Sequence, residues 1–193
     1  QGAKILRTTD GRRFETIPLH FPFAESYYSF RSMTLYKNRM YLLGLSSDSD
    51  APDLLEADDP ASGAFRPVSE IGFGDPQNTG AFELAVFAGY LYVGTFGALD
   101  GFQLLKTQAT GVPPYTFEKA LVQGAYRGIK NQSVLSLQAY KDHLYLGTGV
   151  YFGSVNLIPD FRPAVAELLR VAPDDSWEIV AGEERMTPEG FKA

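Results

Sequence analysis

A repeat with a period of about 50 residues constrains this chain more than any other feature of its sequence. In each of four copies, a leucine-rich segment precedes an aromatic residue. The pairs are 5–7 with Phe14, 54–56 with Phe65, 104–106 with Phe117, and 168–170 with Trp177. The aromatic residues are 51, 52 and 60 positions apart. A near-constant period of this length is typical of proteins in which each copy is one supersecondary unit packed against the next.

A second motif lies between the copies of the first, at 33–44, 84–95 and 135–148. Each copy has a short apolar segment, a tight polar turn, and a second segment rich in Tyr, Leu and Val that ends at a glycine. This pattern predicts β-hairpins, with strands at 33–36, 40–43, 84–87, 91–94, 135–139 and 144–147. The second strand of each hairpin is almost continuously apolar, so we expect it to be covered on both faces.

Together the two motifs give four antiparallel strands per repeat, which is the blade of a β-propeller. The sequence therefore predicts an all-β fold. Residues 4–181 resemble kelch-type and Asp-box-type propellers. Single glycines, Gly44, Gly94 and Gly147, stand where kelch strands end in paired glycines, and residues 8–14 resemble an Asp-box turn, with Arg12 in place of its second glycine.

The strand count predicts about 3.5 blades within a single propeller domain over 1–193. Residues 1–30 supply the outer strands of a first blade and a linker, 31–70, 82–122 and 133–181 are full blades, and 182–193 form a tail. Because the first blade lacks its inner hairpin, we expect either a piece of a larger propeller or an imperfectly closed four-bladed ring. We favour the piece, completed by another chain or segment.

Composition narrows the choice of partners. The net charge is −6 and the chain has no basic stripe, which argues against a nucleic-acid partner. No apolar run is long enough for a membrane helix, and there is no cysteine. Because the sequence starts at Gln1 rather than Met, we expect a processed protein that is extracellular or periplasmic, with a cytoplasmic location still open.

Three carboxylates lie close together after the first hairpin: Asp48, Asp50 and Asp53. Hard cations such as Ca²⁺ prefer several oxygen ligands on one short loop. The rest of a known calcium loop is missing, so the alternative is a solvated acidic turn. No other cofactor is expected.

The segments that lead into the innermost strands should converge at the mouth of a central channel, where propellers bind ligands. Polar and aromatic side chains occur together in these segments: Tyr28, Arg31, Glu83, Tyr126, Arg127 and Asn131. Such a mixture suits a sugar, a carboxylate ligand or a peptide. The alternative is that these side chains satisfy backbone groups where strands crowd together.

The third full repeat contains an apolar insertion that includes Tyr151, Phe152 and Phe161. An insertion of this composition is expected to pack on another element or another chain.

Two functions remain open. The first is a non-catalytic propeller that binds a protein or glycan through its loop face, because no nucleophile or metal motif is present. The second is part of a propeller enzyme, of the glycoside hydrolase or lyase type, with its active site at the channel mouth.

Overall fold

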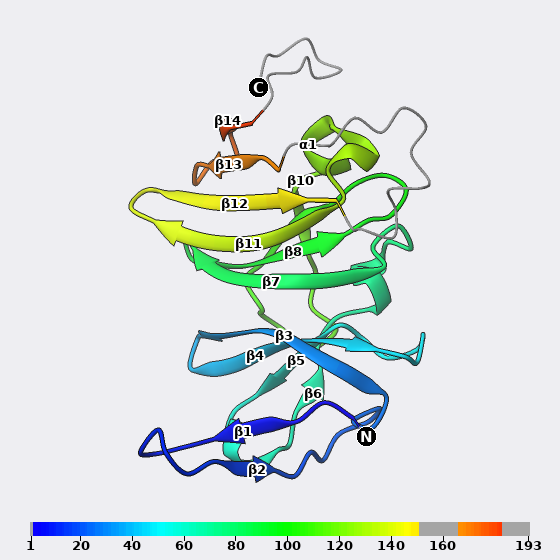
Figure 1. The fold of residues 1–193 in the computed structure, drawn as a ribbon, viewed down its shortest axis with the longest axis vertical. Helices are drawn as coiled ribbons and strands as arrows, with labels where there is room; N and C mark the ends of the chain where they lie inside the picture. Colours follow the sequence, from blue (N-terminus) through cyan, green and yellow to red (C-terminus); the bar gives the residue numbers. More distant parts are fainter. Residues whose placement is uncertain (1, 151–165, 183–193) are drawn as a thin grey trace.

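The computed structural model describes residues 2–150 and 166–182, which form antiparallel sheets stacked along the long axis of the molecule (Figure 1). The N-terminal ribbon consists of β1 (Ile5–Arg7) and β2 (Glu15–Ile17). Blade 1 consists of β3 (Tyr27–Tyr36), β4 (Arg39–Ser46), β5 (Leu54–Ala57) and β6 (Arg66–Pro67). Blade 2 consists of β7 (Gly80–Phe87), β8 (Tyr90–Phe96), β9 (Leu104–Thr107) and β10 (Glu118–Leu121). Blade 3 consists of β11 (Ser133–Tyr140), β12 (His143–Gly149), β13 (Leu168–Val171) and β14 (Trp177–Ala181).

Each blade is a four-stranded antiparallel meander in chain order. Blades 2 and 3 are joined at one residue pair, Ser133 of β11 opposite Phe96 of β8. The first strands of the blades lie next to one another, since β7 contacts both β3 and β11. This arrangement is an all-β, partial β-propeller, as the repeat predicts.

Helical structure in the described residues is limited to single turns: η1 (Pro60–Ser62), η2 (Ile71–Gly74), α1 (Gln123–Tyr126) and η3 (Gly128–Lys130). Two of them, η2 and α1, include residues with left-handed backbone angles. Turns η2, α1 and η3 carry the chain from the outer strand of one blade to the inner strand of the next, whereas η1 lies between β5 and β6 of blade 1. The described residues contain no helix that is long and apolar enough to cross a membrane.

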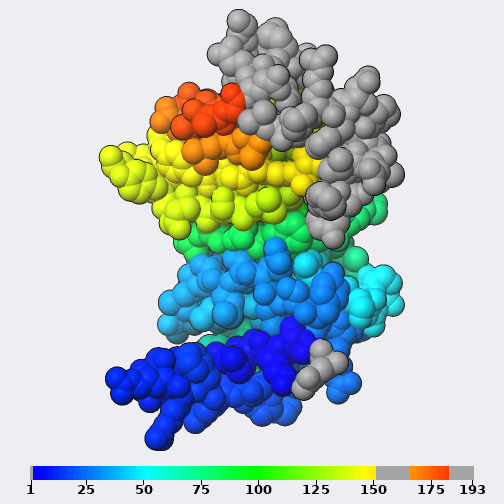
Figure 2. Space-filling model, in the orientation of Figure 1, coloured from blue at the N-terminus to red at the C-terminus, as the bar shows by residue number. Residues whose placement is uncertain are grey.

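Apolar side chains fill each space between neighbouring sheets, which gives the layered body seen in Figure 2. Ile5 and Ile17 of the ribbon pack with Leu42 and Leu55 of blade 1. Leu43 and Leu54 face the other way, into the core shared with blade 2. A third core lies between blades 2 and 3. Because alternate residues of one strand enter different cores, a central strand must be apolar on both faces.

The predicted strands are confirmed, since each lies within an observed strand. Two-sided burial is also confirmed for the second strands of blades 1 and 2, where Tyr41, Leu42, Leu43, Leu91, Tyr92 and Val93 are fully buried. In blade 3, Leu144 and Leu146 are buried between the sheets, whereas Tyr145 points to the outer face and is half-buried.

The register corrects the alignment of the glycines. Arg39, Tyr90 and His143 occupy equivalent positions in the three blades, because each forms the first residue pair after its hairpin turn. Five residues further along the second strand, Gly44 is therefore equivalent to Thr95 and Thr148 rather than to Gly94 and Gly147. The N–H groups of these three residues donate to the carbonyls of Asp53, Gln103 and Glu167, at 2.9, 3.0 and 2.9 Å. Gly44 has its own reason to be glycine, because a Cβ there would lie 2.4 Å from the Tyr27 ring.

The channel-mouth residues of blades 1 and 2 lie on strands rather than in loops. Strand β3 begins at Tyr27, so it includes Tyr28 and Arg31, and Glu83 lies on β7. The bulges in β3 explain the difference, because they let an irregular, polar sequence keep pairing with β4. The predicted partner-contact residues Tyr151, Phe152 and Phe161 lie outside the described residues.

Candidate functional site

The loop edge of blade 2 is closed by a side-chain network centred on Asn78, Thr95 and Gln103, all of which are buried. The Asn78 amide donates to Gln103 Oε1 at 3.1 Å, and the Thr95 hydroxyl donates to Asn78 Oδ1 at 2.8 Å. Gln103 Nε2 donates to Asp75 at 2.8 Å, and Lys119 Nζ lies 2.7 Å from the same carboxylate oxygen. Each of these polar groups therefore has a partner within the blade.

Blade 3 repeats this network with Asn131, Thr148 and Glu167. The Asn131 amide donates to Glu167 Oε2 at 3.0 Å, and the Glu167 N–H donates to the Thr148 hydroxyl at 3.1 Å. Arg127 supplies the cation, with its Nε 3.4 Å from Glu167 Oε2. The two blades thus share one arrangement, which we call the asparagine device: an asparagine amide donates a hydrogen bond to the side chain of the residue that precedes the third strand.

The structure brings together the predicted residues Tyr126, Arg127 and Asn131. Trp177 completes the group, since its ring stacks with Tyr126 at 6.5 Å and lies 5.6 Å from the Arg127 guanidinium carbon. Arg127 and Asn131 are buried, 7% and 2% exposed. Both side chains contact Glu167, and each donates to a backbone carbonyl of the turn, Arg127 to Ala125 and Asn131 to Gly124. These contacts support the structural alternative for these two residues.

Blade 1 lacks the asparagine device of blades 2 and 3. By register, Tyr27 stands at the position of Asn78 and Asn131, because Ser29 pairs with Leu45 as Gly80 pairs with Phe96. The Tyr27 hydroxyl donates to the carbonyl of Pro52 at 2.5 Å rather than to the Asp53 side chain. The Asp53 carboxylate instead accepts a hydrogen bond from the backbone N–H of Gly72 in the turn that leads to blade 2.

A cavity of about 220 Å³ opens at this point, between the loop edges of blades 1 and 2. Two carboxylates line it, those of Asp48 and Asp53. Its other polar side chains and its aromatic ring belong to Tyr28, Ser46, Ser49, Asn78 and Thr79. Tyr28 is 61% exposed, so its ring is available to a ligand.

Electrostatics set this cavity apart. Burial raises the pKa of Asp53 to about 6, and the hydrogen bond from Gly72 opposes the shift. Burial also raises the pKa of Tyr27, and the nearby charges of Asp53 and Asp48 add to that effect. No cation among the described residues offsets this shift, and a desolvated carboxylate with a raised pKa is the kind of group that marks a binding or catalytic site.

Of the three predicted metal ligands, Asp48 and Asp53 line the cavity and Asp50 does not. Asp50 is exposed, and its backbone N–H donates to Asp48 Oδ1 at 2.9 Å, as in an acidic turn. Within residues 2–150 and 166–182, no three His, Cys, Asp or Glu side chains are grouped to hold a metal ion. The aspartates therefore do not form the predicted three-carboxylate cluster.

Arg31 and Glu83 meet at the boundary of β3 and β7. The Arg31 guanidinium carbon lies 5.0 Å from the centre of the Phe82 ring. Burial raises the pKa of Glu83, while the charge of Arg31 and a hydrogen bond from Ser32 oppose the shift. Glu83 is therefore a half-buried carboxyl group on an innermost strand.

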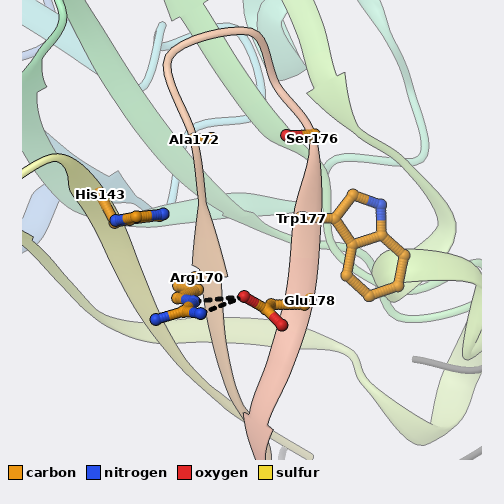
Figure 3. A pocket seen from close by; sticks show the side chains of 6 residues that line it. All are labelled: His143, Arg170, Ala172, Ser176, Trp177 and Glu178. Carbon is orange, nitrogen blue, oxygen red and sulfur yellow. Dashed lines mark hydrogen bonds and ion pairs between the residues drawn. The ribbon is translucent and has the colours of Figure 1, made fainter.

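A second cavity, of about 280 Å³, is lined by His143, Arg170, Ala172, Ser176, Trp177 and Glu178 of blade 3 (Figure 3). Arg170 and Glu178 form an ion pair within this cavity. Arg170 and Glu178, the strong charges among the described residues of the lining, thus neutralise each other. This pairing leaves less charge for a ligand than the Asp53 cavity offers.

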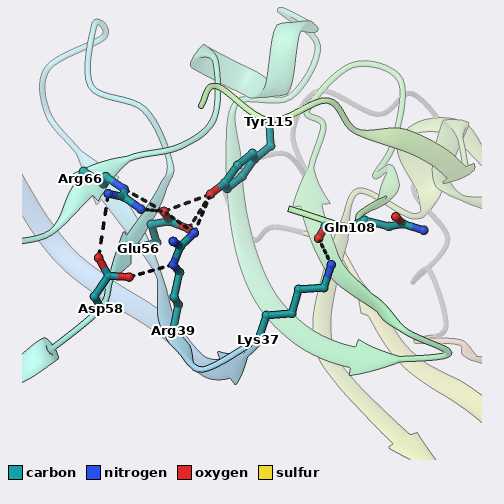
Figure 4. Close-up of polar contacts among 7 residues, drawn as sticks. All are labelled: Lys37, Arg39, Glu56, Asp58, Arg66, Gln108 and Tyr115. Carbon is teal, nitrogen blue, oxygen red and sulfur yellow. Dashed lines mark hydrogen bonds and ion pairs between the residues drawn. The ribbon is translucent and has the colours of Figure 1, made fainter. Parts of the chain in front are cut away.

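The most buried carboxylate of the described residues joins blades 1 and 2 near their hairpin edge (Figure 4). Glu56 is 0% exposed and accepts from Arg66 Nε at 2.8 Å. The Tyr115 hydroxyl of blade 2 lies 3.0 Å from both of its oxygens. Because arginines and a tyrosine surround this carboxylate, its role is to hold the sheets together.

Sequence reasoning found Tyr28 and Asp53 but assigned them to different sites. It missed Asn78, Thr79, Glu167 and Trp177, because their contacts depend on the register between segments far apart in the chain. The one available signal was the recurrence of Asn about two residues before the inner strand, at Asn78 and Asn131.

No family model matches the sequence, and neither does any curated protein. Among solved structures, the chain is similar to an alpha-L-arabinofuranosidase from Clostridium thermocellum, with a TM-score of 0.49 and 12% identity. The match covers 96% of this chain and 62% of that protein, so the chain spans less than two thirds of its length. The fold assignment therefore rests on the sheets themselves.

Proposed function

We propose that this chain is a non-catalytic propeller module that binds a protein or glycan ligand through its loop face. The observation that carries the proposal is the cavity between blades 1 and 2, where an exposed Tyr28 ring stands beside the half-buried Asp53 carboxylate. An aromatic surface next to a few fixed polar groups is the usual composition of a ligand site.

The size of the cavity indicates what part of a ligand it holds. About 220 Å³ is below the ~300–1,000 Å³ of sites for drug-sized molecules. It suits one side chain or one sugar ring of a larger ligand whose remainder lies on the neighbouring loops. The exposed ring of Tyr28 would then contribute most of the contact area.

Binding to defined peptide and glycan arrays tests this proposal, with Tyr28→Ala compared against Tyr140→Ala. The two tyrosines are matched in exposure, 61% and 59%, but Tyr140 ends β11 at the opposite, hairpin edge. We expect Tyr28→Ala to weaken each specific ligand by about tenfold or more and Tyr140→Ala to leave binding unchanged. Equal effects of the two variants would refute the loop-face site.

A second candidate, a propeller enzyme of the glycoside hydrolase or lyase type, is favoured by one observation. Asp53 and Glu83 both have raised pKa values, as general acids do. Turnover on a panel of oligosaccharides that is abolished by Glu83→Gln or Asp53→Asn would support this candidate. Turnover that survives both variants would exclude these two carboxyl groups as the catalytic pair.

We also propose that another chain or segment completes the propeller. The N-terminal ribbon pairs only with itself in the described residues, and Leu6 and Phe14 on it are 55% and 60% exposed. Light scattering after size exclusion tests this, because a stable 21.2 kDa monomer with a cooperative thermal transition would contradict it.

The remaining proposals concern relationship and location. Asp10 accepts from the N–H groups of Arg12 and Arg13, both at 2.8 Å, and Asp174 accepts from Ser176 N at 3.1 Å. This capping supports an Asp-box-like turn before the outer strands. A propeller that presents a ligand site on its loops fits an extracellular or periplasmic protein.

A further inference from the structure

Each of the three blades has an equivalent residue before its third strand, and the contacts of this residue in blades 2 and 3 indicate which groups its counterpart in blade 1 can bind. Asp53, Gln103 and Glu167 each precede the third strand of a blade and accept, through the backbone carbonyl, from the same position of the second strand. Their side chains should therefore meet similar groups at the loop edge. In blades 2 and 3 the groups that they meet belong to the chain itself.

Both of those networks contain an asparagine amide and a cation. In blade 2, Gln103 bonds to Asn78 and to Asp75, which pairs with Lys119 at 2.7 Å. In blade 3, Glu167 bonds to Asn131 and faces the Arg127 guanidinium at 3.4 Å. Among the described residues, each network thus pairs its carboxylate with a positive charge.

In blade 1, the carboxylates of Asp48 and Asp53 are present, but no asparagine stands at the position of Asn78 and Asn131, and none of the described residues of the cavity lining supplies a cation. Tyr27 stands in place of the asparagine, and its hydroxyl donates a hydrogen bond to the backbone carbonyl of Pro52. Two aspartates, Asp48 and Asp53, line the cavity, and within residues 2–150 and 166–182 no Lys, Arg or His lines it. The cavity thus lies beside Asp53, and no cation among the described residues of its lining balances the charges of Asp48 and Asp53.

We infer that the cavity receives the guanidinium or ammonium group of a basic side chain from a protein partner, with Asp53 as its main acceptor. This inference rests on the proposed binding function and names the ligand chemistry of the same site. Asp48 would supply the second negative charge, and Tyr28 the aromatic surface.

Blade 3 provides a precedent for this geometry within the same molecule. There the Arg127 guanidinium contacts the Glu167 carboxylate and also lies 5.6 Å from the Trp177 ring. Planar guanidinium groups pair with carboxylates and stack on aromatic rings at the same time. A sugar ring would match the size of the cavity, but its neutral hydroxyls would leave two neighbouring carboxylates without a counter-charge.

The experiment is an NMR titration of the whole chain at pH 7.5 with three small probes: N-acetyl-arginine amide, N-acetyl-lysine amide and the neutral N-acetyl-citrulline amide. The backbone N–H of Gly72 reports on the site, because it donates to Asp53. We expect both cationic probes to shift this resonance, with roughly millimolar affinity for a single group in an open cavity. Citrulline amide should bind at least about tenfold more weakly.

Two variants complete the test. Asp53→Asn keeps the shape of the side chain and removes its charge, and it should weaken the cationic probes at least about tenfold. Asp142→Asn is the matched control, because Asp142 is an exposed aspartate in a hairpin turn, and it should bind like the unaltered chain. A thermal melt of each variant confirms that it is folded.

Several results would overturn the inference. They are no shift with either cationic probe, equal binding of citrulline amide, or unchanged binding by Asp53→Asn. A monosaccharide that shifts Gly72 and loses affinity in Asp53→Asn would also overturn it, while leaving the proposed binding function in place. Arrays that yield no ligand sensitive to Tyr28 would instead remove the proposed function itself.

Discussion

Asp53 is held partly out of water by the same contacts that place it in the cavity. Its pKa in the folded chain is about 6, against 3.8 in an unfolded chain. Between these values the folded state binds more protons than the unfolded state, so the free energy of unfolding falls as the pH rises. Above about pH 6 the buried charge destabilises the fold.

Asp53→Asn should therefore raise the free energy of unfolding at pH 8 by about 1–3 kcal/mol, because it removes the buried charge. Near pH 3.5 the two proteins should have similar stability. Urea denaturation at both pH values measures this. A variant that is less stable than the unaltered chain at pH 8 would show that Asp53 has a stabilising partner.

Asp75 illustrates the opposite case. Hydrogen bonds from Lys119, Gln103 and the N–H of Gln77 lower its pKa to about 2. A lowered carboxyl pKa contributes stability above the unfolded value of 3.8, and this contribution is lost as the pH falls toward 2.

Asp75→Asn should lower the free energy of unfolding at pH 7 by about 1–2 kcal/mol, since the carboxylate is only 20% exposed. The difference should shrink as the pH falls and vanish below about pH 2. Thermal unfolding followed by circular dichroism across this range gives the result. A constant difference at every pH would mean that packing, not charge, explains the effect.

At the residue scale, sequence reasoning could list the polar and aromatic candidates but could not place them together. Tyr126, Arg127 and Asn131 lie close together because few residues separate them in the chain. Glu167 and Trp177 join them through β13 and β14, and that meeting depends on the pairing of distant strands.

At the scale of elements, blades 1 and 2 are joined by a buried carboxylate as well as by apolar side chains. Glu56 on β5 is surrounded by Arg39, Arg66 and the Tyr115 hydroxyl (Figure 4). Removing a buried acceptor leaves its donors without a partner, although both arginines can turn toward water.

Glu56→Ala should lower the free energy of unfolding by roughly 1–3 kcal/mol. Glu15→Ala serves as the control, because the Arg7–Glu15 pair is exposed on the ribbon and should contribute less than about 1 kcal/mol. Chemical denaturation of both variants decides the matter. Equal losses would contradict the role of Glu56 as a buried link between the blades.

The hairpins were predictable because period-two patterns, tight turns and apolar second strands recur three times. The register between paired strands was harder to predict from the sequence. Gly44, Gly94 and Gly147 look equivalent in sequence, but a Cβ at each would meet a different neighbour: Tyr27, Val134 or Ser136. At each position a neighbouring side chain leaves no room for a Cβ, and these close approaches can be seen only once the neighbouring strands are placed.

At the scale of the whole molecule, the 50-residue period gave the stacking of sheets, since each repeat needs a neighbour to bury its faces. It did not show that blade 1 lacks the asparagine device of blades 2 and 3. The Asp53 cavity lies at this departure, between two blades. The proposed function thus follows from a difference between repeats, not from the repeat.

The most direct test of this account is to map, by amide chemical shifts, where a ligand selected on the arrays binds the intact chain. The account predicts that the largest changes cluster at Ser49, Gly72 and Thr79, which line the cavity, and that the hairpin turns at Asn38, Gly89 and Asp142 stay unchanged. Changes centred on those turns, or on the Arg170 cavity of blade 3, would contradict it.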